Sequence, residues 1–281
     1  GPFSISSVDE DISIILKRNE NYHGVDEFGN PLPFLDAISI QFIKDKKTEL
    51  FEFRKGNLEM IYRLPTDYII EILEETIASE KGEYKNYELQ RVPEMMTQFL
   101  VFNLQDQVFR NINVRKAFNY AIDREKILDF VLNGEGYAPG NHGITPPVFE
   151  DYDISDVYGY SLNVDSARYF LSLAGYPEGR NFPEIELYLN PEGERNTNVA
   201  LEVQKQIKDH LNIDIRLTIL PFAQLIEKSY QGGFKLMRAG WVADFPSAEN
   251  FLWLFYGENV PTKGGEISYP NIARYKNPEF D

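Results

Sequence analysis

The chain has 281 residues, of which 43% are hydrophobic and 26% charged, as is typical of a globular protein with a substantial core. Its formal net charge of −16 disfavours nucleic acid and anionic membrane surfaces as partners. It has no cysteine and only 3 histidines, which excludes disulfides and cysteine-ligated metals and disfavours a histidine-rich metal site or a Ser-His-Asp triad.

The N-terminal part of the chain predicts strands, turns and short helices. Segment 12–18 is apolar and β-branched, and segment 37–43 alternates apolar with polar side chains, so both are expected to be strands. Segments 48–54 and 67–75 predict short helices. Segment 95–104 is apolar and predicts a long strand.

The remainder of the chain alternates helical and strand patterns. Asn113 is the expected N-cap of a helix that continues to Gly134, and Asn163 that of a second helix ending at Gly175. The segment between them, 137–160, is irregular and rich in Pro and Gly. Later segments predict a parallel or mixed sheet covered by helices: strands at 185–189, 213–220 and 234–241, and helices at 198–211 and 222–230.

The last of these strands leads into a segment that places an indole and a carboxylate close together, Trp241 and Asp244. Ligands of α/β sheets usually bind at strand ends, so the segment is a candidate ligand site. The alternative is that Trp241 belongs to the core and that Asp244 caps the turn before Pro246. Spacing alone leaves both interpretations open.

Separated motifs along the chain follow the order found in one known family. The strongest is Asn113–Arg124, which is similar to the family's Val-Arg-x-Ala-x-x-x-Ala-Ile-Asp-Arg helix; within it Arg115, Asp123 and Arg124 are expected to form structural charge pairs between neighbouring helical turns. The others are Gly1-Pro2-Phe3, Arg18-Asn19-Glu20-Asn21-Tyr22, Pro33-Phe34-Leu35-Asp36, Gly56-Asn57-Leu58-Glu59 (Glu where the family has Asp), Ala174-Gly175-Tyr176-Pro177, and Gly240-Trp241 with Asp244.

Together these motifs resemble the solute-binding proteins of ABC importers for peptides, of the dipeptide- and oligopeptide-binding type. The resemblance covers nearly all of the chain and implies an α/β, two-lobed fold of the periplasmic-binding-protein type II class. We expect an internal fragment with a mixed β-sheet: 1–97 as partial lobe I, 98–106 as a hinge strand, and 107–281 as lobe II, incomplete at its C-terminus.

The resemblance also implies a role for the Trp and Asp of this segment. In peptide-binding members the carboxylate at the position of Asp244 pairs with the α-ammonium group of the peptide. A charge-assisted bond of this kind is strong, and leaving either charge buried and unpaired is costly. Trp241 would form a flat apolar wall for the first side chain of the peptide, with plain core packing as its alternative.

Five further residues complete the expected ligand site. Gly240 would let the ligand backbone approach closely, and Val242 would contribute its backbone only. Arg238 would hold a ligand carboxylate bidentately or, alternatively, form a surface ion pair. Phe102 and Asn103 are expected to face the cleft from the segment that passes between the lobes.

The resemblance implies a binding protein that closes two lobes on a peptide and delivers it to a membrane permease. We expect a monomer with no catalytic activity, cofactor, metal or nucleic-acid partner, located in the periplasm or at the extracellular face of the cell membrane, free or as a lipoprotein. The alternatives are a receptor of the same fold for an oligosaccharide or metal complex and a carboxylate-based hydrolase. Against the hydrolase, the chain has no Gly-x-Ser-x-Gly or His-Glu-x-x-His motif.

Overall fold

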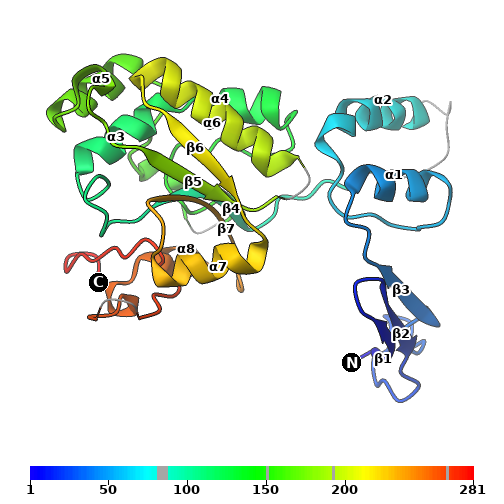
Figure 1. Ribbon diagram of the computed structural model, residues 1–281. Coiled ribbons are helices and arrows are strands. Elements are labelled where there is room, and N and C mark those ends of the chain that lie inside the picture. The colour runs from blue at the N-terminus through cyan, green and yellow to red at the C-terminus, as the bar shows by residue number, and fades with distance from the viewer. Residues whose placement is uncertain (81–87, 150–151, 192–193, 264–265) are drawn as a thin grey trace. The chain divides into compact units, whose positions relative to one another are not determined.

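The computed structural model describes residues 1–80, 88–149, 152–191, 194–263 and 266–281. The contacts within the chain define two compact units, Gly1–Pro65 and Thr66–Asp281, which we call unit 1 and unit 2 (Figure 1). The expected hinge strand, 98–106, lies in unit 2, where most of it is part of a sheet. The lobe boundaries expected from the sequence remain a prediction.

Unit 1 contains a three-stranded antiparallel sheet and one helix. The strands are β1 (Phe3–Asp9), β2 (Ser13–Arg18) and β3 (Ala37–Gln41), in the order β1-β2-β3, and the helix is α1 (Lys46–Arg54). The strands predicted at 12–18 and 37–43 are confirmed, whereas β1 was not predicted. Its register with β2 shifts between Ile5 and Ser7, and an irregularity of this kind breaks the period of two that identifies a strand.

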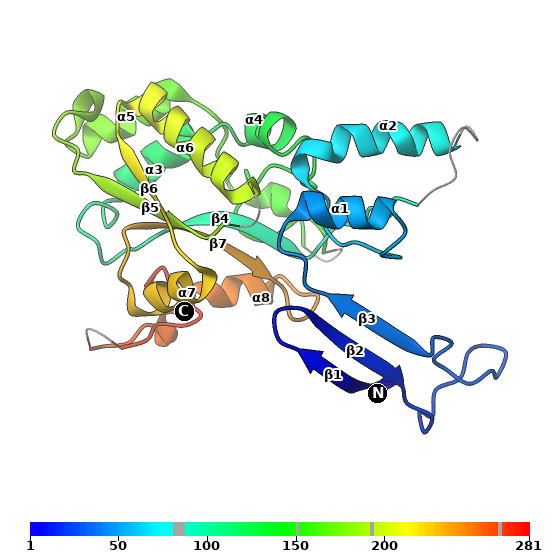
Figure 2. The same cartoon turned by 45° about the vertical axis from the view of Figure 1, so that its right-hand side comes forward.

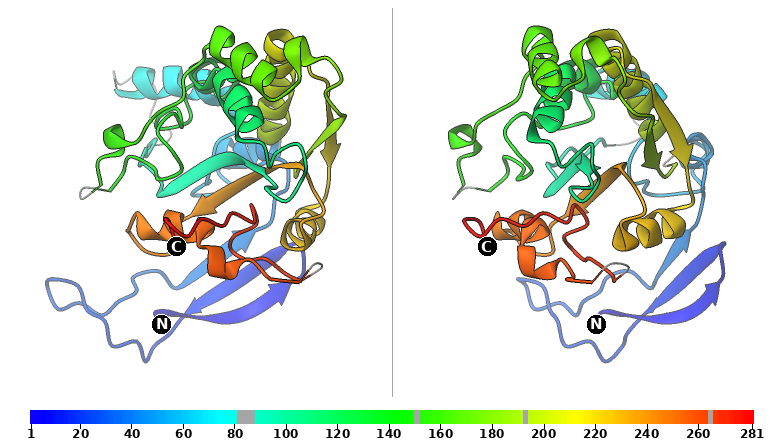
Figure 3. Two further views of the ribbon diagram at one scale, coloured as in Figure 1. Left: turned by 90° about the vertical axis from the view of Figure 1, so that its left-hand side faces the viewer. Right: turned by 60° about the vertical axis from the view of Figure 1, so that its left-hand side comes forward.

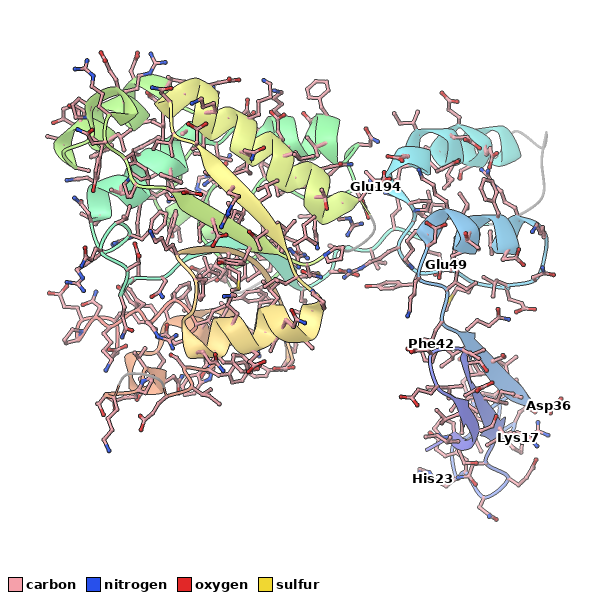
Figure 4. All side chains as sticks on the ribbon, viewed as in Figure 1. Lys17, His23, Asp36, Phe42, Glu49 and Glu194 are labelled. Atoms are coloured by element: carbon pink, nitrogen blue, oxygen red, sulfur yellow. The ribbon has the colours of Figure 1, made fainter. Side chains whose placement is uncertain are left out.

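The strands of this sheet bury none of their side chains. Phe42, which follows β3 and is labelled in Figure 4, is also exposed. Hydrophobic stabilisation scales with the apolar area removed from water, so the three strands contribute little of it.

Unit 2 contains a mixed four-stranded sheet with the order β4-β7-β5-β6 (Figure 2). Its strands are β4 (Met96–Phe102), β5 (Ile185–Leu189), β6 (Ile215–Ile219) and β7 (Leu236–Val242). Strands β7, β5 and β6 run parallel to one another, and β4 is antiparallel to β7. The predicted mixed sheet, with the three later strand segments in one sheet, is therefore confirmed.

Helices cover both faces of this sheet. We call the face covered by α3, α5 and α6 the α6 face, and the opposite face, covered by α7 and the segment that follows β7, the α7 face (Figure 3). No helix among the described residues is both long and apolar enough to cross a membrane. The helices of unit 2 are α2 (Ile69–Glu80), α3 (Ile112–Ala121), α4 (Arg124–Lys126), α5 (Val164–Leu173), α6 (Arg195–Leu211), α7 (Phe222–Gln231) and α8 (Glu249–Leu252).

The main core lies on the α6 face. Ile185, Leu187 and Leu189, alternate residues of β5, are fully buried there against the helices, among them Leu171 of α5 and Ile207 of α6. Side chains of a strand alternate between the two faces, so five residues of β5 supply three core side chains to this layer. A smaller core on the α7 face is formed around Met237 and Leu225.

The helix predicted from Asn113 to Gly134 is broken in the structure. The N-cap of α3 is Asn111, whose side chain accepts a hydrogen bond from Asn113 N at 2.9 Å, and α3 ends at Ala121. Asp123 then caps α4 by accepting from Lys126 N at 2.9 Å, and a π-helical turn, Ile127–Val131, follows. The apolar spacing continues through the break. However, the Asp123 side chain accepts from the backbone N–H of Lys126, which in a continuous helix would donate to a backbone carbonyl one turn earlier.

The two arginines near this break have structural roles, but not the predicted charge pairs. Arg124 donates hydrogen bonds to the backbone carbonyls of Asn119, Ile122 and Tyr160, and Arg115 likewise donates to two carbonyls of the segment before α3. Burial lowers the pKa of Arg124. The guanidinium fork provides several donors, so one side chain ties the broken helix to the loop that precedes α5.

Candidate functional site

The part of the predicted site from Gly240 to Asp244 lies at the carboxyl end of β7, one of the parallel strands of unit 2. Strands β6 and β7 flank β5 on opposite sides, and the helices that follow β5 and β6 cover opposite faces of the sheet. This is the expected result of two right-handed crossovers that run in opposite directions. The point of reversal, outside the carboxyl ends of the strands, is where open α/β sheets bind ligands.

The register of β4 with β7 divides the predicted site residues between the two faces. Leu100 pairs with Arg238, Gln98 with Gly240, and Met96 with Val242. The side chains of directly opposite residues lie on the same face of a sheet. Leu100 packs on the core that is formed with α3, α5 and α6, so these three pairs lie on the α6 face. Arg238, Gly240 and Val242 therefore belong to the α6 face, whereas Trp241 belongs to the α7 face.

Trp241 is half-buried and has partners within unit 2. Its Nε1 donates a hydrogen bond to Oδ1 of Asn250 at 2.7 Å, and its ring lies 6.4 Å from the ring of Tyr269. Asn250 itself is buried in the segment after β7. These contacts account for Trp241 without a ligand, so its role as a pocket wall remains a prediction.

The α6 face of β4 and β7 becomes exposed towards the carboxyl end of β7. Leu236 is fully buried, Arg238 is half-buried, and Gly240 and Val242 are exposed, with Val242 at 56%. Gln98 on β4, opposite Gly240, is exposed as well. We call the surface formed by Gln98, Arg238, Gly240 and Val242 the ledge.

The backbone along the ledge has an open edge. Ala243 N donates to the carbonyl of Met95 at 2.8 Å, so the peptide groups of Ala243 point towards β4. Peptide groups alternate along a strand, and those of Gly240 and Val242 must therefore point away from β4, towards the β5 side. The pairing with β5 is confined to the first two residues of β7, and no described residue forms a backbone hydrogen bond with Gly240 or Val242 on that side.

Asp244 lies two residues beyond the end of β7 and is exposed. Within the part of the chain that the structure describes, no side chain or backbone group forms an ion pair or hydrogen bond with its carboxylate. The turn after it is closed by Ser247 N donating to the carbonyl of Phe245 at 2.9 Å, without help from Asp244. The alternative of a turn-capping carboxylate therefore has no support in the geometry.

Arg238 has two neutral partners that the sequence did not predict. Its Nη1 donates to Oδ1 of Asn190 at 3.2 Å, and its Nη2 donates to Oε1 of Gln98; these are not all the interactions of Arg238. Asn190 directly follows β5, and a polar residue at the end of a buried strand is a signal that could have identified it. Gln98 becomes evident only once the register between β4 and β7 is known.

Phe102 and Asn103 lie at the other end of the β4–β7 pair from Asp244. Phe102 pairs with Leu236, and six residues of extended strand separate Leu236 from Val242, roughly 20 Å. The Phe102 ring stacks on Phe109 with centroids 4.6 Å apart. Asn103 is 6% exposed, and its Nδ2 donates to two backbone carbonyls, those of Gly232 and Phe234, each at 3.0 Å. These contacts give both residues a packing role.

We expect Asn103→Ala to lower the free energy of unfolding of unit 2 by about 1–3 kcal/mol, because it removes the side-chain donor to two carbonyls, one in a buried and one in a partly buried hydrogen bond. Urea denaturation followed by tryptophan fluorescence would measure the change, since both Trp residues lie in unit 2. Gln107→Ala, at an exposed position of the same loop, should change stability by less than about 0.5 kcal/mol. Equal stability of the Asn103 variant and the wild type would contradict a packing role.

The arrangement can bind three kinds of group. The open edge of β7 can pair with backbone amides, the Asp244 carboxylate can accept from an ammonium group, and the Arg238 guanidinium can donate to a carboxylate or carbonyl oxygen. In the described part of the chain, no three or more His, Asp or Glu side chains are grouped so as to hold a metal ion.

Comparison with known proteins places the chain in a family. The model of the bacterial extracellular solute-binding proteins, family 5, middle region, matches residues 1–262. The oligopeptide-binding protein OppA of Bacillus subtilis is 27% identical over 288 residues, which cover 100% of this chain and 48% of that protein. The heme-binding protein A of Haemophilus influenzae is 25% identical over 292 residues, covering 100% of this chain and 47% of that protein.

The fold agrees with this match. The periplasmic binding protein DppA of Helicobacter pylori, solved in complex with the peptide STSA, superposes with a TM-score of 0.82 at 23% identity, covering 99% of this chain and 49% of that one. The chain spans about half the length of the curated relatives it matches. It belongs to family 5 of the bacterial extracellular solute-binding proteins.

Proposed function

We propose that the protein containing this chain is the substrate-binding component of an ABC importer, and that it captures peptides in a cleft between two lobes. The observation that carries the proposal is the open edge of β7, which leads directly to an exposed carboxylate, Asp244, that has no ion-pair or hydrogen-bond partner among the described residues. The open edge of β7 recognises a peptide backbone, and the Asp244 carboxylate recognises a free amino terminus.

In the proposed complex the peptide adds an extended segment to β7. Its backbone pairs with the free peptide groups of Gly240 and Val242, a mode of binding that is independent of the peptide side chains. Its α-ammonium group pairs with Asp244. Every peptide with a free amino terminus carries that cation, so one carboxylate can anchor many sequences. Trp241 contributes an apolar wall from the other face of the strand.

The rest of the proposal concerns the whole protein. Residues 1–97 form part of lobe I, the chain crosses between the lobes at 98–106, and hinge motion closes the lobes on the ligand. The protein acts as a monomer in the periplasm or at the extracellular face, and delivers peptides to a membrane permease without catalysing a reaction. The net charge of −16 argues against nucleic acid as a partner.

We expect native mass spectrometry of the complete gene product, purified from its own host under mild conditions, to detect co-purifying peptides. The reason is that a two-lobed site buries most of its ligand and releases it slowly. Fragmentation of the released ligand identifies its class directly. A haem group, which the name of one relative suggests, or an oligosaccharide in place of peptides would contradict the proposal.

A further inference from the structure

The segment that leads into α2 is bound to the rest of unit 2 by polar groups. We call residues 66–76, the 3-10 turn before α2 and most of the helix, the α2 segment. Thr66 Oγ1 donates a hydrogen bond to Oε2 of Glu135 at 3.3 Å, and Asn133 Nδ2 donates to the backbone carbonyl of Thr66 at 3.0 Å. Both partners lie in the turn that follows the π-helical residues Ile127–Val131.

This turn holds its two polar groups in place independently of Thr66. Asn133 and Gly134 have φ angles of 50° and 71°, in the left-handed region that asparagine and glycine tolerate best. Glu135 forms an ion pair with Arg195, the first residue of α6, and the two side chains are only 21% and 19% exposed. The acceptor for Thr66 is therefore positioned from α6, and its donor by the backbone of the turn.

The α2 segment takes no part in the two hydrophobic cores described for unit 2. Ile69 and Ile72 are buried, but neither belongs to either core. A cavity of about 410 Å³ lies beside the polar contacts, lined by Asp67 of the α2 segment and by Phe130 and Leu201, among others, of the rest of the unit. Polar contacts beside a cavity can separate at little cost, because water replaces each lost hydrogen bond and little apolar area becomes exposed.

We propose that Thr66, Asn133 and Glu135 form a latch that holds the peptide-bound protein closed. The inference rests on the proposed function, in which residues 1–97 belong to lobe I and residues 107–281 to lobe II, so that these two hydrogen bonds join one lobe to the other. Bonds that form only when the lobes close stabilise the closed state and slow the release of peptide. They leave the first encounter of the peptide with the open protein unchanged.

The test uses the complete gene product, with alanine peptides of two to five residues as probes. Stopped-flow tryptophan fluorescence gives the association and dissociation rate constants of the wild type, Thr66→Val and Asn133→Gly; glycine retains the left-handed backbone at position 133. For at least one peptide length we expect each variant to raise the dissociation rate constant about 3- to 10-fold, the range for loss of one hydrogen bond. The association rate constant should change by less than about twofold.

Thr76→Val provides the matched control. It makes the same chemical change as Thr66→Val within the same segment, but Thr76 Oγ1 donates to the carbonyl of Ile72 inside α2, at 2.8 Å. Both of its rate constants should stay within about twofold of the wild type. Urea denaturation of every variant separates a loss of stability, which a purely structural contact would cause, from a change in the rate of release.

The outcomes distinguish this inference from the proposed function. If alanine peptides bind and depend on Asp244, but Thr66→Val and Asn133→Gly release them at the wild-type rate, the latch is wrong and the function stands. Slower association with unchanged dissociation would also contradict the latch, because the bonds would then already exist in the open protein. If no alanine peptide binds the wild type, the proposed function fails and this inference fails with it.

Discussion

Replacing Asp244 by asparagine should weaken binding of peptides with a free amino terminus by about 2–5 kcal/mol, the usual cost of removing one member of a buried charge pair. This corresponds to an increase in Kd on the order of 30- to several thousand-fold. Asparagine keeps the shape of the side chain but cannot neutralise an ammonium group. Calorimetry with the complete gene product and one peptide would measure the effect.

The size of the effect also reports whether the ligand buries Asp244. The carboxylate is exposed in the structure, and an ion pair that stays in solvent is worth only about 0–1 kcal/mol. A loss of 2–5 kcal/mol therefore requires that binding removes both charges from water, as closure of two lobes would do.

Two controls accompany this measurement. Glu249→Gln removes a neighbouring exposed carboxylate and should leave peptide affinity nearly unchanged. An N-acetylated peptide should bind the wild type poorly and lose much less on mutation. If Asp244→Asn left affinity within about twofold, Asp244 would not anchor the amino terminus, and a neutral solute such as an oligosaccharide would become the better interpretation.

Replacing Phe118 by alanine should lower the free energy of unfolding of unit 2 by about 3–5 kcal/mol, the typical cost of removing a large side chain from a packed core. Phe118 is 1% exposed, and its ring lies 5.5 Å from Phe109 and 5.9 Å from Phe102, edge to face with both. The truncation leaves a cavity where α3 meets β4. Urea denaturation followed by tryptophan fluorescence reports on this unit.

Phe130→Ala provides the matched control for this variant. Phe130 lies in the same unit but is 76% exposed, so the same change of side chain should alter stability by less than about 0.5 kcal/mol. Similar effects of the two substitutions would mean that the core on the α6 face does not hold unit 2 together.

The elements with a regular hydrophobic period were predictable from the sequence. Strand β5 was predicted to the residue, and α6 begins three residues before the predicted helix. The elements that were missed or mistaken have two different causes. The irregularity in β1 shifts its pattern, and Asp123 interrupts a helix whose apolar spacing carries on unbroken.

Only part of the candidate site could be predicted from the sequence. The position of Asp244 at a strand end follows from local patterns, and the structure places it there, exposed. Which residues share the ledge depends on the pairing of β4 with β7, which no local pattern encodes. For the same reason the sequence did not show that Trp241 and Gly240 lie on opposite faces of the sheet, as adjacent residues of a strand do.

The pairing of β4 with β7 also affects how unit 2 folds during synthesis. Met96 of β4 pairs with Val242 of β7. The first strand of the sheet can therefore pair only after a strand more than a hundred residues later in the chain has been synthesised. Contacts so distant in sequence slow folding, and an unpaired apolar strand invites association with other chains in the meantime. The sheet of unit 2 therefore cannot be completed until synthesis has passed β7, so its folding depends on nearly the whole length of the unit.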